Sequence, residues 1–281
     1  MPGGILYGFQ RTGKTYAIKY VHDMIPNEFG ENFPVFIFEC AYHKTNVSDN
    51  TFYQELLTDL NHAFYKQGRA PDKLKRLREY LSEQIDNSGH WQAVLIFDDA
   101  HRLYAYQYEW LMDIYNYLDK IQIKPTFLFV GQPELGFLRN SFQGTNKNQI
   151  IGRFMVCEQY FHGLTNPDDI STCLKVYDGT EFSGDSYTRD FYKNAWDQGW
   201  RIEQYSQLIW DSFSKLRVKF SMSEDFEIPM QFFCSVIENL FKKYSDPETT
   251  EPIINEKMII KLIKDSRYIE AEFNLNSNFE N

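Results

Sequence analysis

The stretch of sequence that decides the fold is residues 8–15, GFQRTGKT. It matches the pattern G-x-x-x-x-G-K-[ST] in full, and it lies between an apolar strand predicted at residues 4–7 and a helix predicted at residues 14–24. The glycines of such a loop let backbone N–H groups surround a phosphate, and the helix dipole adds to the attraction. Lys14 would reach the β- and γ-phosphates, and the Thr15 hydroxyl would ligate Mg²⁺. The predicted nucleotide-contacting residues of this segment are Gly8, Arg11, Thr12, Gly13, Lys14, Thr15 and Tyr16.

A second apolar stretch ends in two acidic residues. Residues 93–99 read AVLIFDD, which predicts a buried strand with Asp98 and Asp99 at its carboxyl end. Asp98 would hold Mg²⁺ through water, as P-loop enzymes arrange it. Asp99 would polarise the attacking water as a general base. Together with the phosphate-binding loop, these two residues predict a protein that binds and hydrolyses a nucleoside triphosphate.

The composition is that of a folded protein that is not built into a membrane. The chain has 281 residues, of which 43% are hydrophobic and 24% charged, and this balance excludes intrinsic disorder for most of its length. No apolar run reaches the roughly 20 residues that a membrane-spanning helix needs. The start of the chain does not resemble a signal peptide, and the four cysteines are widely scattered. We therefore expect a cytoplasmic protein.

The alternation of apolar runs and amphipathic stretches predicts two domains. An α/β domain over residues 1–165 would contain a parallel sheet, and a smaller all-helical domain would occupy residues 166–281. The predicted strands lie at residues 4–7, 34–39, 93–97 and 126–131, with a fifth near 155–161. The predicted helices of the first domain lie at residues 14–24, 50–67, 72–85 and 107–121. Turn-forming residues at 166–168 and 178–180 precede helices predicted at 185–196, 202–216, 227–244 and 255–270.

The motifs taken together resemble a known family. GFQRTGKT, VLIFDDAHRL (residues 94–103), FLFVGQPEL (residues 127–135) and IIGRF (residues 150–154) are similar to segments of the AAA+ ATPases of the TnsC/TniB type. The resemblance runs from about residue 4 to residue 164. It implies a three-layer P-loop AAA+ domain followed by a helical lid, with ATP and Mg²⁺ as cofactors. It also implies a regulator of DNA transposition that assembles as a ring or filament on double-stranded DNA and links target-selection proteins to the transposase.

The resemblance also implies roles for several polar residues. Gln132, after the strand at residues 126–131, resembles the sensor-1 position, which responds to the γ-phosphate. Arg153 resembles the arginine finger that reaches a neighbouring subunit's ATP. Arg139 is the alternative for that role, and we favour Arg153. Arg201 resembles sensor 2 of the lid. His101 has no metal-ligand partners at suitable spacing, so we expect a polar loop residue there.

Two features depart from the family pattern. Asp99 stands where the family usually has glutamate, and its shorter side chain would hold the water less well, which predicts slow hydrolysis with intact nucleotide binding. The family also carries helices before the first strand. Either the natural chain is longer at its start or this member does without them.

DNA contact is expected from a local basic surface, because the chain as a whole is acidic. The chain carries 29 Lys and Arg against 39 Asp and Glu, a net charge of −10, so only a local basic surface could face DNA. We predict backbone phosphate contacts from Lys44, Thr45, Arg69 and Lys73, against the alternative that residues 69–78 form a solvated charged helix. The alternative function is a nucleotide-gated assembly ATPase, of a defence or signalling system, that does not bind DNA.

Overall fold

The computed structural model describes residues 3–182, 185–223 and 225–279, and these form two compact units. Unit 1 holds the described residues up to Gln10 and Lys14–Phe161. Unit 2 holds Arg11–Gly13 and the described residues from His162 onward. Each unit has a hydrophobic core of its own.

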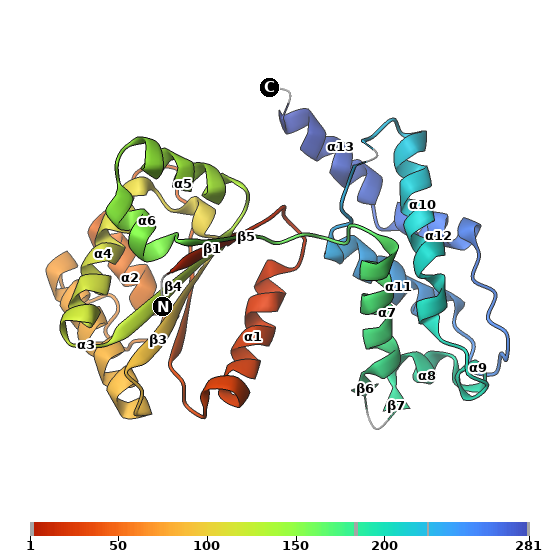
Figure 1. Ribbon diagram of the computed structural model, residues 1–281, viewed down its shortest axis with the longest axis horizontal. Coiled ribbons are helices and arrows are strands. Elements are labelled where there is room, and N and C mark those ends of the chain that lie inside the picture. Colours follow the sequence, from red (N-terminus) through yellow and green to blue (C-terminus); the bar gives the residue numbers. More distant parts are fainter. Residues whose placement is uncertain (1–2, 183–184, 224, 280–281) are drawn as a thin grey trace. The chain divides into compact units, whose positions relative to one another are not determined.

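Unit 1 is a parallel five-stranded sheet with helices on both faces (Figure 1). The strand order is β2-β3-β4-β1-β5. The strands are β1 (Gly4–Tyr7), β2 (Val35–Glu39), β3 (Gln92–Asp98), β4 (Lys124–Gly131) and β5 (Cys157–Tyr160). The helices are α1 (Lys14–Phe29), α2 (Asp49–Asp59), α3 (Ala70–Ser88), α4 (Ala105–Lys120), α5 (Glu134–Gly144) and α6 (Asn148–Phe154), and a 3₁₀ turn, η1 (Ala100–Arg102), follows β3. Helix α1 covers one face of the sheet and the other helices cover the opposite face.

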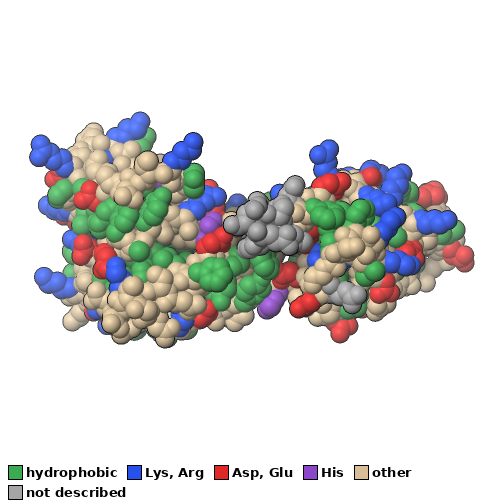
Figure 2. Space-filling view, turned by 90° about the horizontal axis from the view of Figure 1, so that it is seen from above, with side chains coloured by type: hydrophobic (Ala, Val, Ile, Leu, Met, Phe, Trp, Pro, Cys, Tyr) green, Lys and Arg blue, Asp and Glu red, His purple; other side chains and the backbone are tan. Residues whose placement is uncertain are grey.

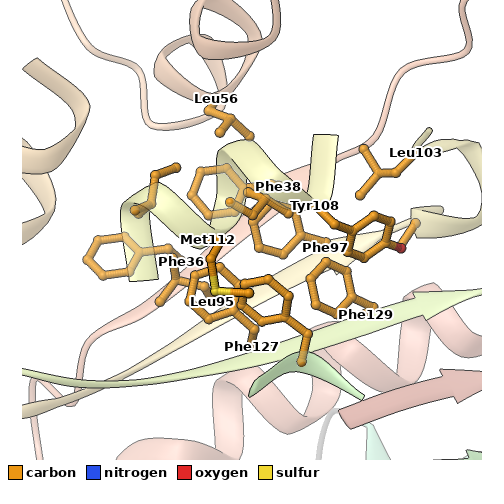
Figure 3. Packing of buried hydrophobic residues seen from close by; sticks show 14 of the residues in the cluster. Phe36, Phe38, Leu56, Leu95, Phe97, Leu103, Tyr108, Met112, Phe127 and Phe129 are labelled. Carbon is orange, nitrogen blue, oxygen red and sulfur yellow. The ribbon is translucent and has the colours of Figure 1, made fainter. Parts of the chain in front are cut away.

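The sheet is apolar on both faces because the side chains of β3 alternate between two cores. On the face opposite α1, Phe97 stacks on Phe38, Phe127 and Phe129 at centroid distances of 4.9, 5.7 and 5.1 Å (Figure 3). On the α1 face, Ile96 packs with Ile18 and Val130. Fully burying such a side chain stabilises the fold by about 1.5–3 kcal/mol.

Parallel pairing brings the strand ends together at one edge of the sheet. Tyr7 of β1 is paired with Gly131 of β4, and Phe97 of β3 is paired with Phe129 of β4. The loops that follow β1, β3 and β4 therefore leave the same edge. In open α/β sheets, this carboxyl edge is where ligands bind.

Unit 2 is largely helical. It contains α7 (Pro167–Gly179), α8 (Tyr187–Phe191), α9 (Lys193–Asp197), the 3₁₀ turn η2 (Ile202–Tyr205), α10 (Ser206–Lys219), α11 (Met230–Tyr244), α12 (Glu256–Asp265) and α13 (Tyr268–Phe279). A short hairpin of β6 (Glu181–Phe182) and β7 (Asp185–Ser186) follows α7, so this unit is not all-helical. Among the described residues, no helix combines the length and the apolar character needed to cross a bilayer.

The predicted fold class, a parallel sheet flanked by helices and followed by a helical part, is confirmed, whereas several element boundaries are wrong. The helix predicted at residues 50–67 ends at Asp59, because Asn61 takes the left-handed conformation (φ 52°), which terminates a helix. The helix predicted at 255–270 is split after Asp265 by Arg267 (φ 60°). The turn predicted at residues 166–168 is the start of α7, where the Asn166 side chain accepts the Asp169 N–H at 3.0 Å.

Candidate nucleotide site

The phosphate-binding loop follows β1 closely and requires glycine at its start. A Cβ on Gly8 would lie 2.1 Å from the backbone oxygen of Phe161, so only glycine allows β1 and the end of β5 to pass at this distance. Gly13 has φ of 105°, which side chains rarely adopt, and Arg11 is also left-handed (φ 66°). Helix α1 begins directly afterwards, at Lys14. The chain therefore forms a strand, a tight loop and a helix N-terminus, the arrangement that receives phosphate.

Lys14 is curled into the loop that precedes it. Its Nζ donates hydrogen bonds to the carbonyl oxygens of Gly8 at 2.9 Å and Phe9 at 2.6 Å, and the residue is only 9% exposed. Both acceptors are neutral, and hydrogen bonds to charged acceptors are roughly twice as strong. A phosphate in the loop would therefore compete well for this ammonium group.

The two residues predicted to hold Mg²⁺ are in contact. The Thr15 hydroxyl donates to Oδ2 of Asp98 at 2.8 Å, although the residues lie 83 positions apart. The other carboxylate oxygen, Oδ1, accepts the backbone N–H of Asp99 at 2.9 Å, which holds the carboxylate in place. A hydroxyl and a carboxylate are oxygen ligands of the kind Mg²⁺ prefers, so these residues fit that ion.

Asp99 occupies an unusual backbone position and is tied to a neighbouring cation. Its φ of 53° places it in the left-handed region, at the junction of β3 and η1. Its Oδ2 lies 2.9 Å from Nη2 of Arg102. Arg102 also donates from Nη1 to the carbonyl oxygen of Cys40, at 3.2 Å. The residue predicted to activate water is therefore engaged in an ion pair.

Gln132 lies beside His101, a residue to which the sequence analysis gave no role. The backbone N–H of Gln132 donates to Nδ1 of His101 at 3.3 Å, and the terminal amide group lies 3.1 Å from Nε2 of the ring. The pKa of His101 is lowered, and burial is the largest cause. The carboxylates of Asp99 and Glu134 act in the opposite direction and raise that pKa. The feature of the sequence that could have indicated a role for His101 is its position in VLIFDDAHRL, three residues after Asp98.

The arginine residues predicted to act at nucleotides have different surroundings. Arg139 of α5 donates from Nε to the Met155 carbonyl at 3.0 Å and pairs with Glu158 at 3.2 Å. Arg153 of α6 lies 5.4 Å from the centre of the Tyr115 ring, and no described carboxylate forms an ion pair with it. Arg153 is therefore less constrained, which favours it as the finger, and that role stays a prediction.

Three further residues that were predicted to contact nucleotide have different surroundings in this structure. Within unit 2, Arg201 donates from Nη1 to the carbonyls of Trp196 at 3.1 Å and Trp200 at 2.7 Å, and its guanidinium lies 3.4 Å from the centre of the Trp196 ring. Tyr16, on the first turn of α1, is 80% exposed. Thr12 is buried. Their contacts to nucleotide remain predictions.

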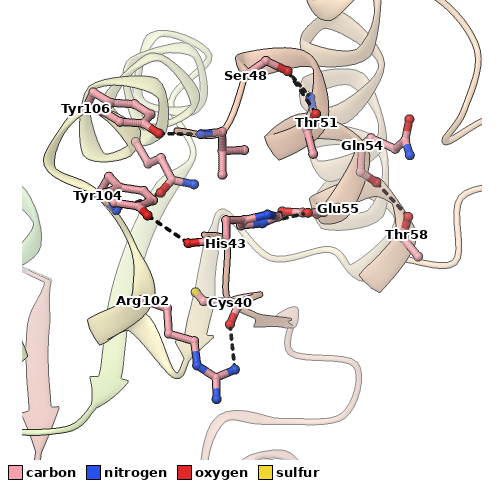
Figure 4. Close-up of polar contacts among 12 residues, drawn as sticks. Cys40, His43, Ser48, Thr51, Gln54, Glu55, Thr58, Arg102, Tyr104 and Tyr106 are labelled. Atoms are coloured by element: carbon pink, nitrogen blue, oxygen red, sulfur yellow. Dashed lines mark hydrogen bonds and ion pairs between the residues drawn. The ribbon is translucent and has the colours of Figure 1, made fainter. Parts of the chain in front are cut away.

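The loop that carries Lys44 and Thr45 is anchored on both sides (Figure 4). The Tyr104 hydroxyl donates to the His43 carbonyl at 2.9 Å, and the Val47 N–H donates to the Tyr106 hydroxyl at 2.8 Å. Lys44 and Thr45, between these anchors, are exposed. The two tyrosines therefore present this short basic loop to the surface.

One predicted DNA contact is wrong. Lys73 of α3 is 1% exposed, and its Nζ donates to Oε1 of Gln54 at 2.7 Å. It lies on the buried face of α3 with Leu77 and Leu81, four and eight residues further on, and a phosphate cannot reach it. Arg69, directly before α3, is exposed.

The sequence analysis missed a second basic surface, in unit 2. Lys257, Lys261 and Lys264 lie on one face of α12 at intervals of four and three residues, and all three are exposed. No ion pair joins any of them to a described carboxylate. On the face shown in Figure 2, basic side chains of unit 2 lie next to one another, whereas those of unit 1 are spread out. The helical spacing of these lysines in the sequence could have indicated this basic surface.

Comparison with known proteins supports the assignment of the fold. A family model described as AAA domain matches residues 3–138. The segment from residue 3 to residue 138 is therefore similar to AAA domains. The stretch includes the phosphate-binding loop, both aspartates and Gln132, and AAA+ ATPases in general use ATP and Mg²⁺. No curated protein matches the sequence.

Solved structures agree with the AAA+ fold. The ORC2 protein of Aeropyrum pernix, in its ADP form, matches with a TM-score of 0.56 and 12% identity, over 94% of this chain and 62% of the other. Cdc6p of Pyrobaculum aerophilum matches with a TM-score of 0.51 and 15% identity, over 86% and 56%. The chain thus spans less than two thirds of either protein, and at these identities the likeness shows the fold alone.

Proposed function

We propose that this chain is an ATP-dependent, DNA-binding AAA+ regulator of DNA transposition. It would oligomerise on double-stranded DNA and link target selection to the transposase. The nucleotide-binding part of this proposal rests on one observation. Thr15 contacts Asp98 at 2.8 Å, beside a buried Lys14, in a segment similar to AAA domains. The sequence motifs shared with the TnsC/TniB type support the transposition part.

The side chains of unit 1 suit the binding of a nucleoside triphosphate. Lys14 would exchange the carbonyls of Gly8 and Phe9 for phosphate oxygens, which are better acceptors because they are charged. Thr15 and Asp98 would hold Mg²⁺, the first directly and the second through water. When bound, Mg²⁺ would neutralise part of the negative charge of the phosphates. Asp99 would orient and deprotonate water once its carboxylate is released from Arg102.

The anchored loop supports the DNA part of the proposal. Lys44 and Thr45 are exposed between the anchors formed by Tyr104 and Tyr106, and Arg69 is exposed before α3. Such residues bind phosphates without regard to sequence, and each contact makes binding sensitive to salt. An assembly of many subunits repeats this modest basic surface, so an acidic chain can still line DNA with positive charge.

Electron microscopy of the full chain tests the proposal. With Mg²⁺ and a slowly hydrolysed ATP analogue, we expect rings or filaments that lengthen on double-stranded DNA. Lys14→Ala should abolish them, because it removes the phosphate-binding cation. A Thr15→Ser variant keeps the hydroxyl and serves as the matched control. Particles that ignore both DNA and nucleotide would contradict the proposal.

A second candidate is a nucleotide-gated assembly protein without DNA. The observation that favours it is the exposed aromatic surface of α1, where Tyr16 is 80% and Tyr20 68% exposed, since such surfaces often contact other proteins. Assembly that depends on ATP and is indifferent to DNA and to Lys44→Ala would select this function. Assembly that weakens with Lys44→Ala only when DNA is present would exclude it.

A further inference from the structure

We infer that His101 is a positioning residue for Gln132: it holds the carboxamide oxygen of Gln132, so that the amide N–H₂ group is available as a donor to the terminal phosphate of bound nucleotide. The inference rests on the proposed nucleotide function and adds to it the residue that determines the orientation of the γ-phosphate sensor.

The chain is built so that His101 can approach β4 closely. His101 lies in η1, after β3, and Gln132 directly follows β4. Gly131, the last residue of β4, makes the approach possible. A Cβ there would lie 3.0 Å from the backbone nitrogen of His101 and 3.2 Å from its Nδ1, closer than most side-chain contacts. The absence of a side chain at residue 131 is therefore what lets the imidazole reach Gln132.

The backbone contact determines which ring nitrogen carries the proton. The N–H of Gln132 donates to Nδ1 of His101 at 3.3 Å, so Nδ1 must present a lone pair. In a neutral imidazole the other nitrogen then carries the hydrogen. Nε2 of His101 is accordingly a donor. Burial, the first cause, lowers the pKa of this ring, as do the charges of Arg102 and Lys14, while Asp99 and Glu134 raise it.

A donor at Nε2 determines in turn the orientation of the Gln132 carboxamide. The terminal amide lies 3.1 Å from Nε2 of His101. Two N–H groups cannot face each other at that distance, whereas a half-turn of the amide brings Oε1 opposite the ring N–H. In this arrangement the oxygen of Gln132 is occupied and both amide hydrogens are free.

This orientation matters because phosphate oxygens only accept hydrogen bonds. An unrestrained glutamine presents either its oxygen or its nitrogen, and the oxygen repels a phosphate. With the oxygen held by His101, Gln132 can act only as a donor. The pair therefore favours binding of ATP, which carries a γ-phosphate, over binding of ADP, which does not.

Two substitutions separate the two ring nitrogens. Gln in place of His101 keeps a donor near the Nε2 position, and Asn keeps only an acceptor near the Nδ1 position. Affinities of the full chain for ADP and for a non-hydrolysable ATP analogue, both with Mg²⁺, should be measured for wild type, His101→Gln, His101→Asn and Gln132→Ala. We expect His101→Asn and Gln132→Ala each to lose about 10-fold or more of the preference for the ATP analogue, the size of one hydrogen bond to a charged group. His101→Gln should retain most of that preference.

Several outcomes would overturn the inference. One is that His101→Asn keeps the wild-type preference for the ATP analogue over ADP, whereas Gln132→Ala loses that preference. Equal losses in His101→Asn and His101→Gln, with equal falls in melting temperature, would indicate a structural role only. Nitrogen-15 NMR of labelled histidine gives a readout without nucleotide: we expect the Nε2–H tautomer at His101, and the Nδ1–H tautomer would contradict us. If wild type bound neither nucleotide, the proposed nucleotide function itself would fail.

Discussion

The carboxylate of Asp99 is paired with the guanidinium of Arg102, with 2.9 Å between Oδ2 and Nη2. Both side chains are about a third exposed, at 34% and 32%. Arg102 also holds the carbonyl of Cys40, at the end of β2 and just before the loop that carries Lys44. The residue that we propose activates water is thus restrained by a group that also contacts the base of the predicted DNA-binding loop.

Releasing Asp99 from this ion pair should raise ATP hydrolysis. We expect Arg102→Ala to increase kcat by up to about fivefold, since a partly exposed pair contributes at most about 1 kcal/mol. Arg102→Lys keeps the positive charge and should stay close to wild type. A fall in turnover in Arg102→Ala, with unchanged nucleotide affinity, would mean that Arg102 supports hydrolysis instead of restraining it.

Lengthening the side chain of residue 99 should also raise turnover. Asp99→Glu moves the carboxylate outward by one methylene, and correcting a misplacement of about one ångström can gain of order 10²-fold in rate. Asp99→Asn has the same shape without the charge, and we expect it to bind ATP normally while losing hydrolysis. Steady-state phosphate release and nucleotide titration measure the two effects. Turnover in Asp99→Asn equal to wild type would exclude Asp99 as the base.

Lys44 and Lys73 should behave differently although both were predicted to contact DNA. We expect Lys44→Ala, alone or with Arg69→Ala, to weaken DNA binding. The slope of log affinity against log salt concentration should become shallower by about 0.9 for each phosphate contact that is lost. Lys73→Ala should leave that slope unchanged, because Lys73 is 1% exposed. It should instead lower the free energy of unfolding by about 1–3 kcal/mol, since Oε1 of Gln54 loses its partner.

The lysines of α12 provide the control for this experiment. Replacing Lys257, Lys261 and Lys264 together by Gln removes three exposed charges and leaves the buried Ile259, Leu262 and Ile263 in place. A salt slope that changes in this variant and not in Lys44→Ala would place the DNA contact on unit 2. Fluorescence anisotropy with a labelled duplex, at several salt concentrations, measures both.

The core of unit 2 contains a buried ion pair that should be costly to break. Arg217 of α10, whose side chain is 5% exposed, donates to the Tyr268 hydroxyl at 2.7 Å and pairs with Glu272 of α13 at 2.8 Å. Arg217→Ala leaves Glu272 without its cation and should destabilise the fold by about 3–5 kcal/mol. Urea unfolding of the full chain measures this loss.

An apolar double substitution tests the physical reason for that loss. Replacing both Arg217 and Glu272 by Met removes the two charges together, and such exchanges are often close to neutral. We therefore expect the double variant to be more stable than Arg217→Ala. A double variant that is no more stable would show that the hydrogen bonds to Tyr268 and to the Ser223 carbonyl, at 3.0 Å, matter more than charge pairing.

Some features of the fold were predictable because their causes are local. The apolar run before Asp98 predicts a buried strand, and the glycines, Lys14 and Thr15 predict the loop between β1 and α1. The start of α7 was equally local, since Asn166 and Pro167 are a good N-cap and first-turn residue, and we interpreted them as a turn only. The helix end at Asn61 also had a local indication, since asparagine adopts the left-handed conformation more readily than most residues, and we overlooked it. The break at Arg267 was harder to predict, because arginine has no such preference.

The sequence by itself determined the five strands, the first four helices of the α/β part and the identity of the phosphate-binding loop, because hydrophobic periodicity and loop chemistry act over a few neighbouring residues. Helices α5 and α6 were not predicted. Only the tertiary structure decided which distant side chains meet. The contact of Thr15 with Asp98 spans 83 positions, and that of His101 with Gln132 spans 31. The burial of Lys73 depends equally on the packing of α3 against its neighbours. Such contacts arise from sheet register and helix packing, which place residues in space without regard to their separation along the chain.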